Sequence, residues 1–357
     1  MNRIESINSI EEFFRQLKDK KCICFGAGRK LDEICSDIPQ LADRIAYIMD
    51  NNPGLHGTDR EIAGQIKKVY LPERLCMEDI STVFLILTST YKKEMTEQLE
   101  KNAKFKELNY CEVEPLLDAM AWSAKCPAAG YRKNKTEVIP RKIHYIWFSE
   151  NPVPPELQKN IDGWKRLCPD YEICRWNEKN YDVTKNPYMY KAYKNKKWSF
   201  VSDYARLDII YQNGGIYLDT DVEMIRRPDE LLYNNAFIGF ERLSTVNTGS
   251  GFGAEKGFPL IGEMRDYYEN IEFIDSENPD DMVLCPIYET GILSRHGLKR
   301  NGNFQIVSGM SVYPVMYFNA KSLYSDRLKI TEETVSVHHC SWTWAGSKSK
   351  IKTGEKI

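Results

Sequence analysis

The sequence has no long apolar run. No segment reaches the length of a membrane-spanning helix, and the opening stretch MNRIESINSIEEFFRQLKDK carries acids where a signal peptide would have its apolar core. Blocks of one charge sign are also missing, since 49 basic and 51 acidic residues are interspersed. A nucleic-acid binder depends on a basic surface, so we expect no nucleic-acid partner and at most peripheral contact with a membrane.

Paired cysteines of the CxxC type are missing as well. The ten cysteines are scattered, and Cys22 and Cys24 lie in an apolar run, as buried thiols do. This usage fits a reducing compartment. We therefore expect a cytoplasmic location, including the inner face of the membrane.

The most informative stretch is 199–222, SFVSDYARLDIIYQNGGIYLDTDV. Apolar residues at helical spacing predict an amphipathic helix that ends at Gly214 and Gly215. After the glycines the pattern changes to an alternation of apolar and polar residues. A strand with this alternation would place Asp219 and Asp221 on one face, at its polar end.

Two carboxylates at one site suit Mg²⁺ or Mn²⁺, which proteins usually share with the phosphates of a substrate. On the helix, Asp203 and Arg206 are three apart and share a face. An acid and a guanidinium beside a metal can hold sugar hydroxyls and phosphate oxygens. A single Asp-x-Asp is a weak signal, because two solvated acids at a strand end explain it equally well.

The complete string is more specific. SDYARL followed by GGIYLDTD resembles the signature of the DXD-containing sugar transferases of glycosyltransferase family 32, and more distantly the glucosylating domains of large clostridial toxins. The resemblance implies that Asp221 ligates the metal directly and that Asp219 shares it. It also implies that Asp203, Arg206 and Tyr217 line the donor pocket.

The N-terminal part shows the order of a dinucleotide-binding unit: a strand, the glycines Gly26 and Gly28, a helix, a second strand and Asp50. The fingerprint is incomplete because Leu31 stands where the third glycine belongs. Residues 21–118 resemble the small Rossmann-like modules of bacterial polysaccharide enzymes. A scaffold or interaction module is the preferred interpretation, and nucleotide binding is the alternative.

The second domain opens with VIPRKIHYIWFSENPVPP, which predicts a strand and a proline-rich loop. Related toxin domains stack a tryptophan at the matching place on the nucleotide base, which would give that role to Trp147; a core tryptophan is the alternative. Ser149 departs from the glycine that many relatives have there. Further on, STVNTGSGFGAEKGFP predicts a flexible loop over donor or acceptor, with Asn247 and Ser250 as candidate contacts, or else a plain surface loop.

Two of the five histidines follow a late strand, in VSVHHCSWTW. An imidazole can complete an oxygen-rich Mn²⁺ site, and the family has a similar C-terminal pattern, although Trp342 and Thr343 depart from it. We favour His338 as the ligand, with His339 as the substitute. The alternative is that both are polar residues at the domain edge.

The predicted architecture is α/β throughout. We expect a Rossmann-like domain over residues 1–120, a linker over 121–136, a transferase domain over 137–346 and a basic polar tail over 347–357. By resemblance, the transferase domain has the GT-A nucleotide-sugar-binding fold, a mixed sheet flanked by helices.

The predicted function is a metal-dependent retaining glycosyltransferase. It would move a sugar from a nucleotide-sugar donor, a UDP-sugar in preference to a GDP-sugar, to a glycan or lipid-linked glycan acceptor in bacterial capsule or cell-surface polysaccharide synthesis. Retention follows from the family alone. The alternatives are a toxin-like protein glycosyltransferase, a non-catalytic nucleotide-sugar sensor, and a dehydrogenase that uses Gly26, Gly28 and Asp50.

Overall fold

The structure is a computed structural model that describes residues 1–5, 7–149, 151–275 and 283–340. The chain forms two compact units. The first contains Met1–Ala124 and two short later segments, Arg242–Ser244 and Ser322–Arg327, and the second contains the rest of the described chain. The predicted boundaries at 120, 136 and 346 stay predictions, and the tail at 347–357 lies outside the described residues.

The first unit is built on a seven-stranded sheet. In spatial order its strands are β1 (Asn2–Arg3), β7 (Asn109–Glu112), β6 (Val83–Leu87), β2 (Lys21–Phe25), β3 (Ile45–Met49), β5 (Gln65–Tyr70) and β4 (Asp59–Ile62). Its helices are α1 (Ile10–Gln16), α2 (Arg29–Asp37), α3 (Leu41–Arg44), α4 (Lys92–Glu100) and α5 (Val113–Trp122). Neighbouring strands are parallel except for the antiparallel pair of β4 and β5.

Both faces of this sheet are buried, as is usual for parallel sheets. On β2 the side chains of Cys22 and Cys24 belong to one core cluster, and those of Ile23 and Phe25 belong to the cluster on the other face. Leu31 is fully buried in the first cluster. The residue in place of the third glycine therefore packs α2 into the core, which explains why the glycine fingerprint is incomplete.

The glycine turn after β2 is held by an acid. Gly26 has φ +115°, and a Cβ there would lie 2.6 Å from the carbonyl oxygen of Thr88. Asp50 Oδ2 accepts a hydrogen bond from the Ala27 amide at 2.8 Å, and Oδ1 accepts one from the Asn52 amide at 2.8 Å. In this structure the carboxylate that could meet a ribose instead fixes two backbone turns.

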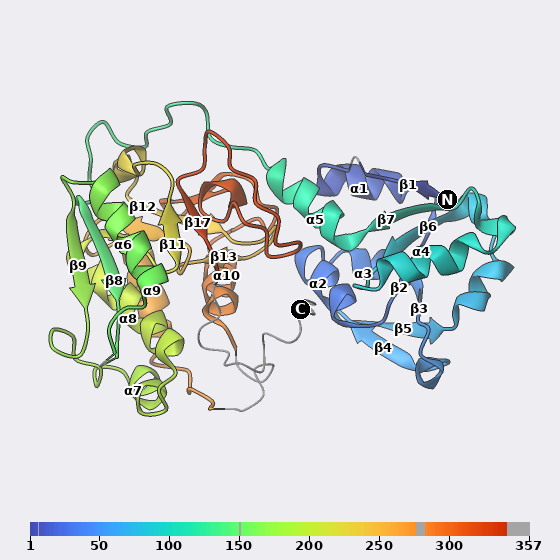
Figure 1. Cartoon of the computed structure of the whole chain (residues 1–357), viewed down its shortest axis with the longest axis horizontal. Helices are drawn as coiled ribbons and strands as arrows, with labels where there is room; N and C mark the ends of the chain where they lie inside the picture. The colour runs from blue at the N-terminus through green and yellow to red at the C-terminus, as the bar shows by residue number, and fades with distance from the viewer. Residues whose placement is uncertain (6, 150, 276–282, 341–357) are drawn as a thin grey trace. The chain divides into compact units, whose positions relative to one another are not determined.

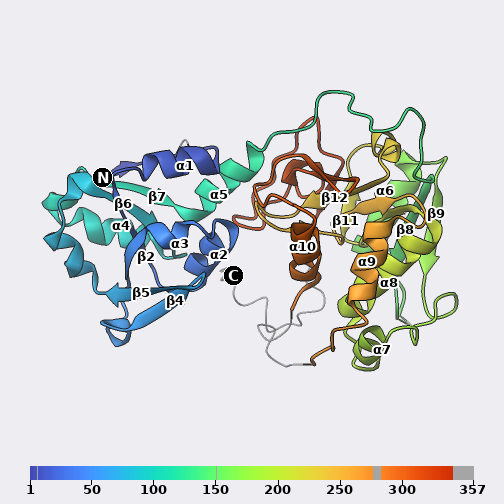
Figure 2. The same ribbon diagram turned by 180° about the vertical axis from the view of Figure 1, so that it is seen from behind.

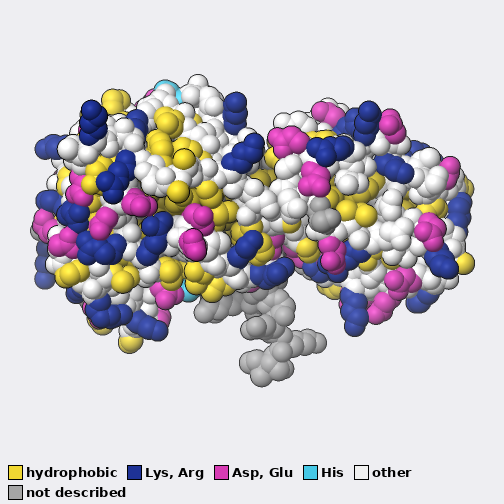
Figure 3. Space-filling view, turned by 90° about the horizontal axis from the view of Figure 1, so that it is seen from above, with side chains coloured by type: hydrophobic (Ala, Val, Ile, Leu, Met, Phe, Trp, Pro, Cys, Tyr) yellow, Lys and Arg dark blue, Asp and Glu magenta, His cyan; other side chains and the backbone are white. Residues whose placement is uncertain are grey.

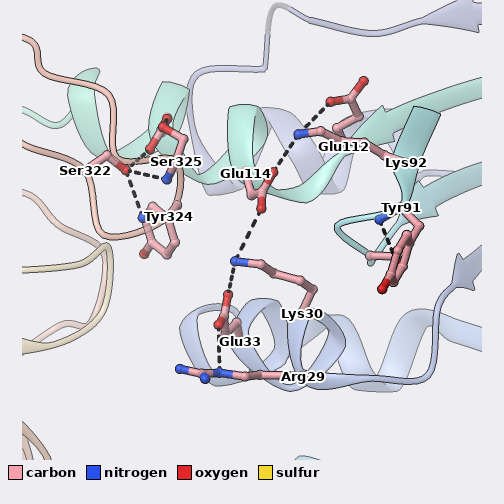
Figure 4. Close-up of polar contacts among 12 residues, drawn as sticks. Arg29, Lys30, Glu33, Tyr91, Lys92, Glu112, Glu114, Ser322, Tyr324 and Ser325 are labelled. Atoms are coloured by element: carbon pink, nitrogen blue, oxygen red, sulfur yellow. Dashed lines mark hydrogen bonds and ion pairs between the residues drawn. The ribbon is translucent and has the colours of Figure 1, made fainter. Parts of the chain in front are cut away.

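Lysine and glutamate side chains alternate in a row of ion pairs near the N-termini of α2, α4 and α5, beside this turn. Lys30 lies between Glu33 and Glu114, and Lys92 lies between Glu114 and Glu112 (Figure 4). Every lysine in this chain of contacts has carboxylate partners, so the positive charges are offset within the unit.

The second unit contains the eight-stranded mixed sheet of the molecule (Figures 1 and 2). In spatial order its strands are β15 (Gln305–Val307), β16 (Met310–Tyr313), β12 (Ala236–Phe240), β14 (Phe252–Ala254), β10 (Gly215–Tyr217), β8 (Lys142–Ile146) and β9 (Glu172–Trp176), with β13 (Val246–Asn247) beside β12. A separate two-stranded sheet pairs β11 (Val222–Met224) with β17 (Ser336–His338). The helices are α6 (Pro155–Leu167), α7 (Pro187–Lys194), α8 (Trp198–Asn213), α9 (Pro259–Tyr267) and α10 (Cys285–Arg295).

Helices cover both faces of the large sheet. On one face of β8, the ring of Tyr145 meets that of Trp164 from α6. On the other face, His144 bonds to the carbonyl oxygen of Gly214, at the end of α8. The strands β8, β9 and β10 are mutually parallel, while β14 is antiparallel to both its neighbours. The predicted class, mixed α/β with a sheet flanked by helices, is confirmed.

Charged side chains of both signs are interspersed on the face shown in Figure 3. Within the described ranges, no helix combines the length and the hydrophobicity that crossing a bilayer requires.

Candidate active site

Helix α8 carries the first two candidate residues. Arg206 Nη2 donates to Asp203 Oδ1 at 2.7 Å, and the Nε and Nη2 groups of Arg206 also donate to the backbone and hydroxyl oxygens of Ser202. Asp203 and Arg206 are almost completely buried. The guanidinium is thus fixed to its own helix by three bonds.

The helix itself differs from the prediction, because it is not amphipathic. Every residue from Phe200 to Ile210 is buried, since α7 and α9 pack on it and the sheet covers another side. A helix enclosed in this way must pair its polar groups. Asp203 pairs with Arg206, and Asp208 accepts a bond from the hydroxyl of Tyr181 at 2.9 Å.

Two glycines turn the chain from α8 into β10. Gly214 has φ +67° and Gly215 has φ +108°, a region that side chains other than glycine rarely adopt. A Cβ would lie 2.9 Å from Pro140 Cδ at the first position and 2.8 Å from His144 Nε2 at the second. The Gly-Gly pair is therefore required by both backbone conformation and space.

Asp219 and Asp221 lie in a turn between two sheets. β10 ends at Tyr217 in the large sheet, and β11 begins at Val222 in the small one. The Val222 amide donates to the Asp219 carbonyl oxygen at 3.0 Å, which closes a β-turn over Thr220 and Asp221. The prediction of one continuous strand is therefore wrong, and the turn brings the two carboxylates together.

Tyr217 links Asp219 to the side-chain pair of Asp203 and Arg206 on α8. The Tyr217 hydroxyl donates to Asp219 Oδ1 at 2.7 Å, and the Arg206 guanidinium lies over the Tyr217 ring at 5.4 Å. Arg206 Nη1 is also 3.8 Å from Asp219 Oδ2. The structure thus brings together four of the predicted site residues, Asp203, Arg206, Tyr217 and Asp219.

The segment from Val246 to Ser250 forms a buried wall of this site. Its five residues are buried, so neither a flexible nor a plain surface loop describes them. The Gly249 carbonyl oxygen accepts from the Asp219 amide at 3.3 Å, and a Cβ on Gly249 would lie 2.6 Å from Asp219 Oδ2. Asn247 Oδ1 accepts from the Gly249 amide at 2.6 Å, and the Ser250 hydroxyl is buried with no hydrogen-bond partner in the described structure.

The second carboxylate meets a histidine from the far end of the chain. β17 runs antiparallel to β11 and pairs His338 with Val222. His338 Nε2 lies 3.2 Å from Asp221 Oδ1. Ligand atoms of Asp219, Asp221 and His338 all lie within 4.8 Å of one another.

His339 lies outside this group. Its Nε2 is 2.9 Å from Glu223 Oε2, and both of these side chains are exposed. Successive residues of an extended chain point to opposite sides, so only one of the two histidines can face Asp221. The structure brings His338 to the carboxylates and turns His339 away from them.

The donor set fits a divalent cation. Three acids, Asp203, Asp219 and Glu289, surround the one guanidinium of Arg206, and Asp221 adds a fourth acid. Burial raises the pKa of Asp203 to about 6 and that of Glu289 to about 7. A raised pKa means that this environment disfavours further negative charge, and a divalent cation on the carboxylates would offset that charge.

A proton and a metal ion would compete for the imidazole of His338. Burial alone would lower the pKa of His338, but Cys340 and Asp221 outweigh it and raise the pKa well above its usual range. Cys340 Sγ lies 3.4 Å from His338 Nδ1. Since imidazole ligates metals in its neutral form, metal binding here would release a proton.

Trp147 lies at the same sheet edge. It follows β8 directly, and β8 is parallel to β10, so both lead to the edge where Asp219 begins the turn. Its amide donates to the Trp176 carbonyl oxygen and its ring Nε1 to that of Asn151, both at 2.9 Å. The ring is partly exposed, unlike a core tryptophan such as Trp164.

Sequence reasoning missed Thr248, Gly249 and Glu289. Glu289 lies on α10 in a region to which no chemistry had been assigned, and it accepts two hydrogen bonds from Thr248. The available signals were the small residues of NTGSG and an acid within the apolar helix pattern of CPIYETGIL. Neither signal indicates which acid the loop would meet.

Residues 154–238 match a glycosyltransferase family model. Its description is "Glycosyltransferase sugar-binding region containing DXD motif". The matched stretch runs from α6 to β12 and includes Asp203, Arg206, Tyr217 and both acids of the turn. Trp147, Glu289 and His338 lie outside it.

Similar curated proteins come from yeasts. Inositol phosphoceramide mannosyltransferase 3 of Schizosaccharomyces pombe is 30% identical over 132 residues, which is 36% of this chain and 36% of that protein. Mannosyl phosphorylinositol ceramide synthase SUR1 of Saccharomyces cerevisiae is 30% identical over 108 residues, or 29% of this chain and 28% of that protein. The chain thus spans about a third of the length of these relatives, and the matches support a glycosyltransferase.

Two solved structures resemble parts of the chain. One, titled "PaToxG Glycosyltransferase", has a TM-score of 0.37 at 17% identity and covers 46% of this chain and 72% of that one. The other is a glycosyltransferase involved in the glycosylation of the major capsid of PBCV-1. It has a TM-score of 0.32 at 13% identity, and the match covers 59% of this chain and 99% of that one. Likenesses at these scores carry no argument about the site.

Proposed function

We propose that this chain is a metal-dependent retaining glycosyltransferase with a GT-A domain, which moves a sugar from a nucleotide-sugar donor to a glycan or lipid-linked glycan acceptor. One observation carries the proposal. Two carboxylates and an imidazole, Asp219, Asp221 and His338, come within 4.8 Å of one another beside the buried pair of Asp203 and Arg206. The turn that carries the carboxylates lies in the segment that matches a DXD sugar-binding region.

The residues divide into two groups by chemistry. Asp219, Asp221 and His338 would hold Mn²⁺ or Mg²⁺, and the imidazole favours Mn²⁺. When bound, such a cation would neutralise the charge that develops on a departing diphosphate. Asp203 and Arg206 would hold the sugar hydroxyls, because a carboxylate accepts and a guanidinium donates. Tyr217 keeps Asp219 in place, and Trp147 offers a partly exposed ring for the nucleotide base.

The transfer exchanges one bond to the anomeric carbon for another. The bond from C1 to the phosphate oxygen breaks, and the acceptor hydroxyl forms the new bond to C1 on the same face. The acceptor proton passes to the departing phosphate oxygen, and the products are the glycosylated acceptor and a nucleoside diphosphate. No separate carboxylate nucleophile is needed for this front-face route, which agrees with the engagement of Asp203 by Arg206.

The relatives guide the choice of donor and acceptor. One is named an inositol phosphoceramide mannosyltransferase and the other a mannosyl phosphorylinositol ceramide synthase. Mannose donors and lipid-linked acceptors therefore belong in the assay panel beside UDP-sugars. Synthesis of capsule or cell-surface polysaccharide at the inner face of the membrane is the setting that we propose, and fractionation of cells that express the chain tests it.

The decisive experiment measures release of nucleoside diphosphate from a panel of UDP- and GDP-sugars, with Mn²⁺ and with chelator. We expect one donor to be hydrolysed and chelator to stop the reaction. Donor binding by calorimetry without turnover, even with glycan and lipid acceptors, would instead indicate a sensor. Transfer to a protein acceptor would indicate a toxin-like enzyme, and NAD bound after purification with no donor binding would overturn the proposal.

A further inference from the structure

Glu289 is a buried acid that the reaction outlined above does not use. It lies on α10, and only 1% of its side chain is exposed. Its Oε2 accepts from the Thr248 amide at 2.9 Å, and its Oε1 accepts from the Thr248 hydroxyl. Burying a carboxylate costs free energy unless its oxygens accept hydrogen bonds. Here both oxygens accept hydrogen bonds from Thr248, one residue of the wall segment.

These bonds fix the direction of the next one. The ionised carboxylate of Glu289 can only accept, so in that form the single hydroxyl proton of Thr248 points to Glu289. Thr248 Oγ1 can then only accept from its other neighbour, which is Arg206 Nη1 at 3.4 Å. The chain of donors therefore runs from Arg206 through Thr248 to Glu289, and all three side chains are buried.

The same nitrogen of Arg206 faces the turn. Nη1 lies 3.8 Å from Asp219 Oδ2, while Nη2 is taken by Asp203 and Ser202. Rotation of the guanidinium would break the hydrogen bond between Nη1 and Thr248. It would at the same time change the distance between Nη1 and Asp219 Oδ2. Among the hydrogen bonds of the described residues, the bond to Thr248 is the one that Arg206 makes outside α8. This bond holds Nη1 on the side of Asp219.

We propose that Glu289 is a positioning residue, which acts through Thr248 to hold the Arg206 guanidinium in the orientation that receives the donor sugar. The inference rests on the proposed function for its catalytic consequence. The orientation itself is a separate property of the protein, and it can be measured without any substrate.

The variants separate the links of the chain. Glu289→Met keeps the length of the side chain and removes both carboxylate oxygens, so both Thr248 bonds are lost. Thr248→Val removes the hydroxyl and keeps Glu289, which tests the same link should the Glu289 variant fail to fold. Thr248→Ser keeps the hydroxyl. Asp208→Asn is the matched control, because Asp208 is another buried acid that contacts Tyr181 and Lys185.

For Glu289→Met and Thr248→Val we expect kcat to fall about tenfold to a hundredfold, the effect of a lost buried hydrogen bond. The KM for the donor should rise as well, because Arg206 would hold the sugar hydroxyls before the transfer begins. The double variant should be no slower than the slower single variant, since both changes break one chain. Thr248→Ser and Asp208→Asn should keep kcat.

The substrate-free measurement is NMR of the Arg206 guanidinium protons, assigned with an R206K variant. We expect slow solvent exchange in the wild-type protein and faster exchange in Glu289→Met and Thr248→Val. Unchanged exchange, or additive losses in the double variant, would overturn the inference and leave Glu289 as a core acid. A wild-type protein that turns over no donor would overturn the proposed function, while the exchange rates would still decide the positioning.

Discussion

The histidine that would complete the proposed metal site is identified at the level of single residues. Only His338 faces the carboxylates, so His338→Asn should weaken Mn²⁺ binding by at least about tenfold to a hundredfold, a loss that changes to outer-shell partners already cause. His339→Asn should bind Mn²⁺ like the wild type, because His339 pairs with Glu223. Calorimetric titration of the two variants measures both affinities. Equal losses, or a loss confined to His339→Asn, would contradict this assignment.

Gly249 offers a second test at this scale. A Cβ there would lie 2.6 Å from Asp219 Oδ2 and 3.0 Å from Arg206 Nη1, and Gly249 has no positive φ. Gly249→Ala should therefore act by displacing these two side chains, lowering Mn²⁺ affinity and kcat/KM by more than about tenfold while costing about 1–3 kcal/mol of stability.

The matched control for Gly249 is Gly291→Ala on α10, where a Cβ would meet nothing within 4 Å. Alanine is the better helix former, so this variant should be as stable as the wild type or more stable by about 0.5–1 kcal/mol. Chemical denaturation and the donor-hydrolysis assay measure both variants. A fully active Gly249→Ala protein would mean that Asp219 and Arg206 tolerate the displacement.

At the residue scale, the sequence was informative where the chemistry is local. Asp203 and Arg206 are one helical turn apart, and Asp219 and Asp221 are two residues apart, so spacing alone predicted both pairs. Thr248 contacts Arg206 from another element and Glu289 contacts Thr248 from α10, and nothing in a single sequence states that α10 lies against the wall segment. The role of each residue stays a prediction until the variants are measured.

At the scale of elements, the helices and strands were predicted well where the hydrophobic pattern is clear. β8 spans Lys142–Ile146, within the stretch that predicts a strand, and α8 ends at Asn213, directly before the two glycines that predict its end. The strand through Asp219 was wrong because an alternating pattern also fits two short strands with a turn between them. Small residues and glycines are typical of surface loops and predict one for the wall segment; Thr248–Ser250 do form a bend and turn, but they are buried, and their small size allows close packing.

Three elements meet at His144, and this contact makes stability depend on pH. Trp176 Nε1 on β9 donates to His144 Nδ1 at 3.0 Å, and His144 Nε2 then donates to the Gly214 carbonyl oxygen at 2.9 Å. Burial lowers the pKa of His144 to about 4, against about 6.5 in the unfolded chain. Between these values the unfolded state binds a proton that the folded state does not, so stability falls as pH falls from 6.5 to 4.

The contribution of His144 to this loss is about 3 kcal/mol, since each unit of pKa difference corresponds to about 1.4 kcal/mol. Above pH 6.5 the group contributes no pH dependence. His144→Gln keeps the donor to Gly214 and cannot titrate, so its free energy of unfolding should fall less steeply over this range. Denaturant titrations at several pH values measure the two slopes, and parallel slopes would show that the pKa of His144 is the same in the folded and unfolded protein.

At the scale of the whole molecule, the excess of buried acid predicts that metal binding stabilises the fold. A cation bound at 100 times its Kd adds about 2.7 kcal/mol, and a unit of this size should then unfold roughly 5–10 °C higher. Asp221→Asn, which is nearly isosteric, should unfold like the metal-free protein and should show no shift with Mn²⁺. Glu223→Gln is the matched control, because Glu223 is an exposed acid two residues away.

Thermal melts with Mn²⁺ and with chelator measure these shifts. A shift that persists in Asp221→Asn would place the cation elsewhere in the protein. The same variant should lose donor hydrolysis, so stability and activity report on one site by independent means.

The pairing of β11 with β17 also sets when the site can exist during synthesis. The ribosome makes Asp221 early and His338 late, roughly ten seconds apart at about 5–20 residues per second. Until His338 emerges, β11 has no partner in its two-stranded sheet, and the carboxylates lack their imidazole. A nascent chain that stalls between the two residues would have no complete place for a metal, so the site can form only after His338 has been made.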